Sequence, residues 1–236
     1  MSGQAKRYLP YTLLLGCVLL VGAVAWSGTA RSINMIASED GFAPGHCLSS
    51  EEIALARLIN AYRSRHGLSA IPLSRSLTQV AQWHVIDLQQ HRPAQRKNSA
   101  GKPCTLHSWS DQGIWKPVCY TSDHASAAGM WNKPREITAN RYSGNGYEIA
   151  YWNAKRVTAS RAFTRWRESL LHREVILEQG GWAGRGWQAM GVGVSLHYAV
   201  VWFGERSDPQ GEVFPCQAET PLPGEKGFET FPFPVR

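Results

Sequence analysis

Several features that would point to a particular function are missing from this sequence of 236 residues. It has no long cluster of lysines and arginines with interleaved aromatic residues, which argues against nucleic-acid binding. It has no internal repeat, which excludes a repeat array. It also has no Cys-x-x-Cys pair, which argues against a zinc site made of four cysteines. What remains is an ordinary globular composition, with 43% hydrophobic residues and therefore an expected packed core.

The N-terminal segment carries no acidic residue in positions 1–30. Lys6 and Arg7 precede an apolar run at 9–26, with the sequence LPYTLLLGCVLLVGAVAW. This pattern predicts an export signal or a single membrane anchor, and its length lies at the border between the two. Ala23-Val24-Ala25 fits a small-x-small cleavage site. Because the basic residues hold the N-terminus inside, we expect the remainder in the periplasm or outside the cell.

The formal net charge is +7, and residues 31–236 carry 23 basic and 18 acidic side chains. This modest excess of positive charge favours contact with anionic material at the cell surface.

Four cysteines follow the apolar run, and an even number in an exported chain predicts two disulfides. Three pairings are possible. We favour Cys104–Cys119, which would clamp a local loop beside His107, and Cys47–Cys216, which would tie the two ends of the folded part together.

The chain divides into a leader at 1–30, a linker at 31–48, a folded region at 49–206 and a proline-rich tail at 207–236. Hydrophobic periodicity and turn residues predict the order of elements in the folded region. That order is helix, helix, long loop, strand, helix and hairpin, so we expect an α+β fold with helices on a small, mainly antiparallel sheet. The predicted elements are a helix opened by a capping box at Ser49–Glu52, a helix at 76–90, a loop at 91–141 with a short helix at 126–131, a strand at 147–152, a helix at 158–177 with Leu170 facing inward, and a hairpin of 190–195 with 198–203.

Glu148 is the one acidic residue in a strand that is apolar on both faces. A carboxylate in a covered strand costs several kcal/mol unless it is paired. Glu148 is therefore a candidate site residue. The alternative is a structural ion pair with Arg63 or Arg173.

Two histidines are candidates to join Glu148 in one cleft. His172 lies three residues after Ser169, on the same face of the helix predicted at 158–177. His107 lies in the long loop, close to Cys104. The alternatives are a surface loop histidine at 107 and a capping or packing role at 172. His84 lies on an apolar helix stripe and is interpreted as a core residue; no role is assigned to His46, His66, His91, His124 and His197.

Taken together, these segments resemble the CAP superfamily, which comprises cysteine-rich secretory proteins, antigen 5 venom allergens, pathogenesis-related proteins and their bacterial relatives with SCP-like domains. The resemblance rests on the order and spacing of short pieces across 49–206. The matching pieces are Asn60-Ala61-Tyr62-Arg63 with His66-Gly67-Leu68, Leu77 through Leu88, His107-Ser108, Gly146 through Ala150, Trp166 through Ser169 with His172-Arg173, and Gly191 through Val194.

The resemblance implies a three-layer α-β-α sandwich with a cleft that holds two histidines and one or two acids. It identifies His107 and His172 with the cleft histidines and Glu148 with the strand acid. The chain departs from the family where Gly146-Tyr147-Glu148 replaces Gly-Glu-Asn, and where Ser169 replaces a second acid, as in bacterial-type members. The loop at 102–137 also matches no common member. We therefore expect three polar ligands in the cleft rather than four.

Two imidazoles and a carboxylate at His107, His172 and Glu148 suit a divalent metal, zinc first. We expect an exported binding module that engages a lipid, a cell-envelope component or such a metal. Five loop tryptophans would offer an amphiphilic surface if exposed, with ordinary packing as the alternative. The other candidate function is a hydrolase or peptidase, because Ser108 and Ser169 each lie near a cleft histidine, although no oxyanion-hole glycine motif accompanies either. The five tryptophans are Trp109, Trp115, Trp131, Trp182 and Trp187.

Overall fold

The computed structural model describes residues 43–216. The predicted leader, most of the linker and tail residues 217–236 lie outside this range. By its internal contacts the chain divides into residues 1–33 and residues 34–236. Both core clusters and both disulfides lie within the second unit, so that unit contains its own folding core.

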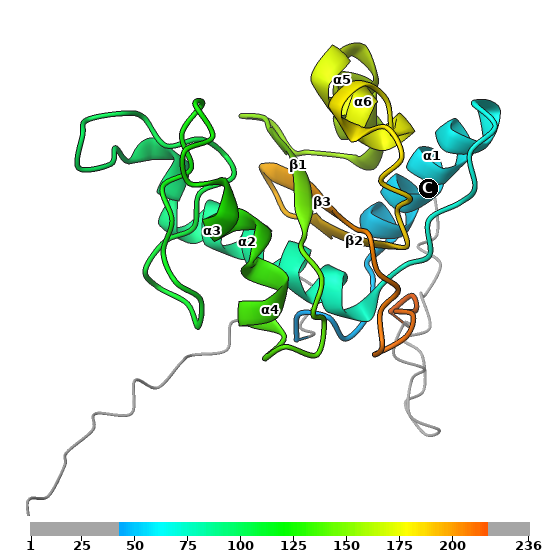
Figure 1. The fold of residues 1–236 in the computed structure, drawn as a ribbon, viewed down its shortest axis with the longest axis horizontal. Helices are drawn as coiled ribbons and strands as arrows, with labels where there is room; N and C mark the ends of the chain where they lie inside the picture. Colours follow the sequence, from blue (N-terminus) through cyan, green and yellow to red (C-terminus); the bar gives the residue numbers. More distant parts are fainter. Residues whose placement is uncertain (1–42, 217–236) are drawn as a thin grey trace, which may run out of the picture. The chain divides into compact units, whose positions relative to one another are not determined.

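Three layers make up the described part, with helices on both faces of one sheet (Figure 1). Helix α1 (Ser50–Arg65), helix α5 (Ala159–Glu168) and helix α6 (Leu170–Leu177) cover one face. Helix α2 (Arg75–His91) covers the other. The expected α+β class, a three-layer α-β-α sandwich, is confirmed.

The sheet has three antiparallel strands in the order β1-β3-β2. They are β1 (Tyr147–Trp152), β2 (Ala189–Val194) and β3 (Tyr198–Gly204), which confirms the predicted strand and hairpin. Strand β1 is an edge strand, and Glu148 lies opposite Trp202 of β3.

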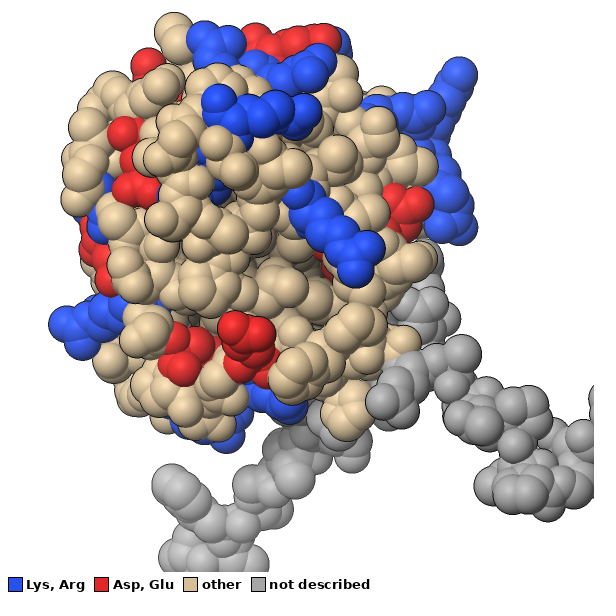
Figure 2. Space-filling view, turned by 90° about the vertical axis from the view of Figure 1, so that its right-hand side faces the viewer, with Lys and Arg blue, Asp and Glu red and all other residues tan. Residues whose placement is uncertain are grey.

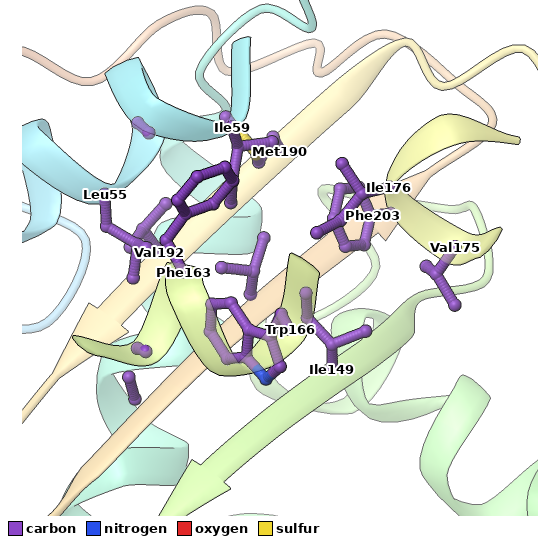
Figure 3. Packing of buried hydrophobic residues seen from close by; sticks show 14 of the residues in the cluster. Leu55, Ile59, Ile149, Phe163, Trp166, Val175, Ile176, Met190, Val192 and Phe203 are labelled. Carbon is purple, nitrogen blue, oxygen red and sulfur yellow. The ribbon is translucent and has the colours of Figure 1, made fainter. Parts of the chain in front are cut away.

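Alternation along β1 sends its side chains into two separate cores. Tyr147 and Ile149 belong to the core under α1, α5 and α6, where Trp166 and Phe163 pack over the strands (Figure 3). Glu148 and Ala150 point the other way, and Ala150 joins the core under α2. Both faces of the strand are therefore covered at Glu148, as predicted.

Helix α2 lies unusually close to strand β2 because two strand residues have no side chain. A Cβ added at Gly191 would lie 2.0 Å from the Leu77 carbonyl carbon, and one at Gly193 would lie 2.4 Å from the Ala81 oxygen. This close approach holds α2, and with it His84, firmly against the sheet.

The first helix begins as its sequence predicts, and the second begins at Arg75, one residue before the predicted start. Ser49 and Glu52 form the capping box of α1, and the Ser74 hydroxyl caps α2. Gly67 follows α1 with a φ of +74°, as expected for a helix stop.

The continuous helix predicted at 158–177 is wrong, because the chain breaks at Ser169. Ser169 has an extended backbone with φ −83° and ψ 122°, which ends α5 and begins α6. The break turns Leu170 outward, so the prediction that it faces the core is also wrong; it is 57% exposed. It also removes the helical spacing from which Ser169 and His172 were placed on one face.

The long loop contains more structure than its sequence indicates. The expected short helix is present as α3 (Ala127–Trp131). It is followed by α4 (Lys133–Ile137), which has Pro134 in its first turn, a position where the missing N–H costs nothing. The loop also contains a short 3-10 helix, η1 (Pro93–Gln95). A second one, η2 (Gly180–Trp182), follows α6.

Both predicted disulfides are confirmed, Cys104–Cys119 within the loop and Cys47–Cys216 between the ends of the described chain. The first part of the tail is tied to the domain by further bonds. Asp208 accepts hydrogen bonds from Ser74 and Ser76 at the start of α2. Leu48 pairs with Pro215 beside the terminal disulfide. Within residues 43–216 no helix combines the length and apolar character needed to cross a bilayer.

Candidate functional site

Glu148 lies at the centre of a polar cluster that is buried against α2. Its side chain is fully buried, and each carboxylate oxygen is bound by a different histidine. Oε1 accepts a short hydrogen bond from His84 Nδ1, and Oε2 accepts one from His107 Nδ1 at 2.8 Å. The acid predicted from the strand pattern is therefore paired, with histidines rather than an arginine.

His84 is a site residue that the sequence interpretation missed. It is buried, as expected for a core residue, yet both of its ring nitrogens face acceptors. Nδ1 donates to Glu148, and Nε2 donates to the Ser108 carbonyl at 3.0 Å. Its ring stacks on Trp109 with centroids 4.0 Å apart. The available signal was a histidine on the face of α2 that packs against the sheet carrying Glu148.

Two opposing effects set the charge of Glu148. Burial raises the pKa of its carboxyl group, but the charges and hydrogen bonds of His84 and His107 outweigh burial and hold the pKa below its usual value of 4.5. Glu148 is thus a carboxylate at neutral pH. The Glu148 carboxylate on one side of His84 and the Ser108 carbonyl on the other are both acceptors, so both ring nitrogens of His84 are placed to donate.

His107 connects this buried pair to solvent, with 24% of its side chain exposed. Its loop is closed by the Cys104–Cys119 disulfide. Ser108 adds two bonds to Tyr120: its hydroxyl accepts from the Tyr120 N–H at 2.9 Å and donates to the Tyr120 carbonyl at 3.3 Å. The Tyr120 ring then packs edge-on against His107, with centroids 5.3 Å apart.

His172 lies in the first turn of α6. Its Nδ1 is 2.8 Å from the Ser169 hydroxyl. Burial lowers the pKa of His172 below its usual 6.5, and the charge of His107 lowers it further. The two imidazoles are therefore close enough to interact. Among the bonds of the described residues none joins His172 directly to Glu148.

The predicted alternatives and accessory features can now be compared with the structure. Arg63 pairs with Glu178 at 2.7 Å, and Arg173 donates to the Arg167 carbonyl, so neither arginine serves Glu148. The prediction of an exposed tryptophan surface is wrong, because these rings pack within the domain. Trp109, Trp115 and Trp187 are buried, and Trp131 and Trp182 pack against the core.

The two serines differ in their suitability as nucleophiles. Ser108 is fully buried, and its hydroxyl is engaged with Tyr120 on both sides. Ser169 is partly exposed and touches a histidine nitrogen, which is the contact that a general base requires. Within residues 43–216 no carboxylate is bonded to His172 to orient it, so Ser169 and His172 form a dyad without the third member of a triad.

The bonds of the predicted ligands can be compared with what a zinc site requires. Zinc in proteins takes three or four protein ligands. Both oxygens of Glu148 already accept from His84 and His107, so binding a metal through this carboxylate would displace one of them. Across the described range no group of three His, Cys, Asp or Glu side chains is arranged to hold a metal ion. The zinc site at His107, His172 and Glu148 remains a prediction.

Comparison with known proteins gives structural similarities alone. No protein-family model matches the sequence, and no curated protein matches it. An outer surface protein from Borrelia burgdorferi is similar over 67% of this chain and 95% of its own, with 17% identity and a TM-score of 0.42. An extracellular protein containing an SCP domain from Bacillus anthracis matches over 66% of this chain, with 16% identity and a TM-score of 0.42. A cysteine-rich secretory protein from Staphylococcus aureus matches over 66% of this chain, with 14% identity and a TM-score of 0.41.

This chain spans 40% of the Bacillus protein and 39% of the Staphylococcus protein.

Proposed function

We propose that this chain is an exported CAP-like binding module, which holds a cell-envelope ligand at the exposed edges of His107 and His172. The observation that carries the proposal is the buried His84–Glu148 pair, which fixes the ring of His107 through Nδ1 while 24% of that side chain stays exposed. A ring fixed in this way offers a preorganised hydrogen-bonding group at little entropic cost. The N-terminal apolar segment and the extracellular or outer-surface neighbours support export.

Ligand binding can be tested by following the ring signals of His107 and His172 by NMR during titration with three probes. The probes are the short-chain lipid dihexanoyl-phosphatidylglycerol, a soluble peptidoglycan fragment and zinc chloride. We expect at least one probe to shift both signals in the wild type, and its affinity to fall at least roughly tenfold in His107→Ala and His172→Ala. His66→Ala, which changes an exposed histidine on another part of the surface, is the matched control. If none of the probes shifts either signal, the proposal fails for these ligand classes.

Zinc is included because the sequence predicts it. Equal zinc content in the purified wild type, His107→Ala and His172→Ala proteins would remove the metal from the proposal.

A hydrolase is the second candidate, and the contact between Ser169 and His172 favours it. A serine activated by a histidine reacts with fluorophosphonates, which modify the hydroxyl covalently. Labelling of the wild type that is lost in Ser169→Ala and His172→Ala, but kept in Ser160→Ala, would establish a nucleophile. An unlabelled wild type would leave the binding module as the better proposal.

A further inference from the structure

The positive charge of this chain is concentrated in one short segment. Residues 153–173 contain six basic side chains and one acid, whereas the rest of 31–236 carries 17 basic and 17 acidic residues. This segment therefore accounts for the whole net charge of +5 that remains beyond the leader. The basic residues are Lys155, Arg156, Arg161, Arg165, Arg167 and Arg173.

These charges lie on the outer surface of α5 and on the segments that flank it. All of them except Arg173 are exposed. Arg161 and Arg165 are one turn apart on the same side of α5. Arg165 is 3.6 Å from the only acid of the segment, Glu168, in an exposed contact that contributes little. Figure 2 shows Lys and Arg side chains gathered at the top of the molecule, at the height that α5 and α6 occupy in Figure 1.

Two large apolar side chains stand out of the same segment. The break at Ser169 leaves Leu170 57% exposed and Leu171 73% exposed, between Arg167 and Arg173. Leu171 is the most exposed large hydrophobic residue of the described part. Single exposed leucines are common on protein surfaces, but an adjacent pair enclosed by arginines is a pattern that suits a charged apolar interface.

We propose that the α5–α6 junction docks on an anionic lipid bilayer, with Leu170 and Leu171 entering the interfacial region and the arginines pairing with lipid phosphates. The charge complementarity selects this partner, because an anionic surface attracts a segment of net charge +5, while the rest of residues 31–236 carries equal numbers of basic and acidic side chains. The apolar pair adds contact area that electrostatic attraction alone does not provide. This surface goes beyond the cleft ligand proposed above and requires nothing from it.

The test uses residues 34–236, which contain the folding core and both disulfides and exclude the apolar segment at 9–26. Binding is measured by sedimentation with vesicles of phosphatidylcholine, and with vesicles that also contain phosphatidylglycerol. We expect binding only to the second kind, and a marked fall when the salt concentration rises from about 0.1 to about 0.5 M, because salt screens the attraction.

Two double variants separate the contributions. Arg161→Gln with Arg165→Gln should weaken binding roughly tenfold or more, because each basic residue near an anionic surface contributes to attraction. Leu170→Ser with Leu171→Ser should also weaken it roughly tenfold, because less apolar surface is removed from water. Lys97→Gln with Lys116→Gln removes the same charge from exposed positions elsewhere and should leave binding within about twofold. Unchanged near-UV circular dichroism would show that each variant is folded.

Absence of binding to the phosphatidylglycerol vesicles would overturn the proposal, and so would an equal loss in the Lys97 and Lys116 control. Sedimentation equilibrium tests the other partner that could cover this surface, which is a second copy of the chain. A wild-type dimer that becomes a monomer in the leucine variant would assign the surface to self-association instead. His107 is not part of this surface, so the loss of ligand affinity in His107→Ala tests the first proposal separately from vesicle binding.

Discussion

At the scale of single residues, the arrangement at Glu148 makes a prediction about stability. Replacing Glu148 by Gln removes the negative charge while keeping the shape, and takes away the buried carboxylate that His84 and His107 share. Breaking a buried pair in this way costs roughly 3 kcal/mol. We expect that loss in the free energy of unfolding by urea at pH 7. Glu168→Gln, which removes an exposed carboxylate, should cost less than about 0.5 kcal/mol.

The lowered pKa of Glu148 also predicts how its contribution to stability depends on pH. The folded pKa of Glu148 lies below the ordinary 4.5 of the unfolded chain, so its stabilisation is complete above about pH 4.5 and is lost as pH falls through the lower folded value. The difference between wild type and Glu148→Gln should therefore narrow as the pH falls below about 4.5. A difference that grows below about pH 4.5 would contradict the assignment of Glu148 as the charged partner.

The coupling between His107 and His172 can be measured directly. Proton NMR should give a pKa for His172 below 6.5, because burial and the charge of His107 both disfavour its protonated form. His107→Gln removes that charge and should raise the pKa of His172. The value should still remain below 6.5, since burial is the larger cause. His66→Gln is the control and should leave it unchanged; no change in His107→Gln would mean that the two rings do not share a site.

At the scale of elements, the sequence predicted most of the fold from local signals. The capping box at Ser49, the apolar stripe of α2 and the alternation of β1 each required nothing beyond their own residues. The break at Ser169 could not be predicted in this way, because neither glycine nor proline marks it. Trp166 packs toward the sheet before the break, and Val175 to Leu177 are buried after it, so tertiary packing overrides a sequence that reads as one helix.

The candidate site, like the fold, could be predicted from the sequence only in part. Glu148 was predictable because an acid in a covered strand must be paired, and His107 because it lies beside Cys104 in a stapled loop. His84 could not be predicted as a site residue. On a helix that packs against a sheet, a core histidine and a site histidine have the same sequence pattern. Only the close approach of α2 to the strands, which Gly191 and Gly193 permit, reveals that His84 reaches Glu148.

The loop that is closed by the Cys104–Cys119 disulfide leads to a separate prediction. Replacing Cys104 and Cys119 together by serine opens a loop with a separation of 15 residues, which should lower the free energy of unfolding by roughly 3 kcal/mol. Because this loop also presents His107, its ring signal should lose its single sharp position in NMR spectra. A variant with full stability and an unshifted His107 signal would show that the bonds from Ser108 to Tyr120 hold the loop without the disulfide.

At the scale of the whole molecule, the Cys47–Cys216 disulfide joins residues that are 169 positions apart and encloses nearly all of the described chain. In the chain-entropy account, a closed loop of that length restricts the unfolded state more than a short one does, and is worth roughly 5 kcal/mol. Replacing both cysteines by serine should therefore cost more than replacing Cys104 and Cys119. Leu48 and Pro215 pair beside the bond, so the ends remain near each other in the folded state without it.

Urea unfolding of the two double variants at the same pH gives the comparison. The expected order places the Cys47 and Cys216 variant as the less stable, with its folded spectrum unchanged, because the bond acts mainly on the unfolded chain. The reverse order would mean that the loop disulfide stabilises the folded state itself, by holding His107 against the buried His84–Glu148 pair. In that case the site, rather than the closure of the chain, would be the larger contributor to the stability of the domain.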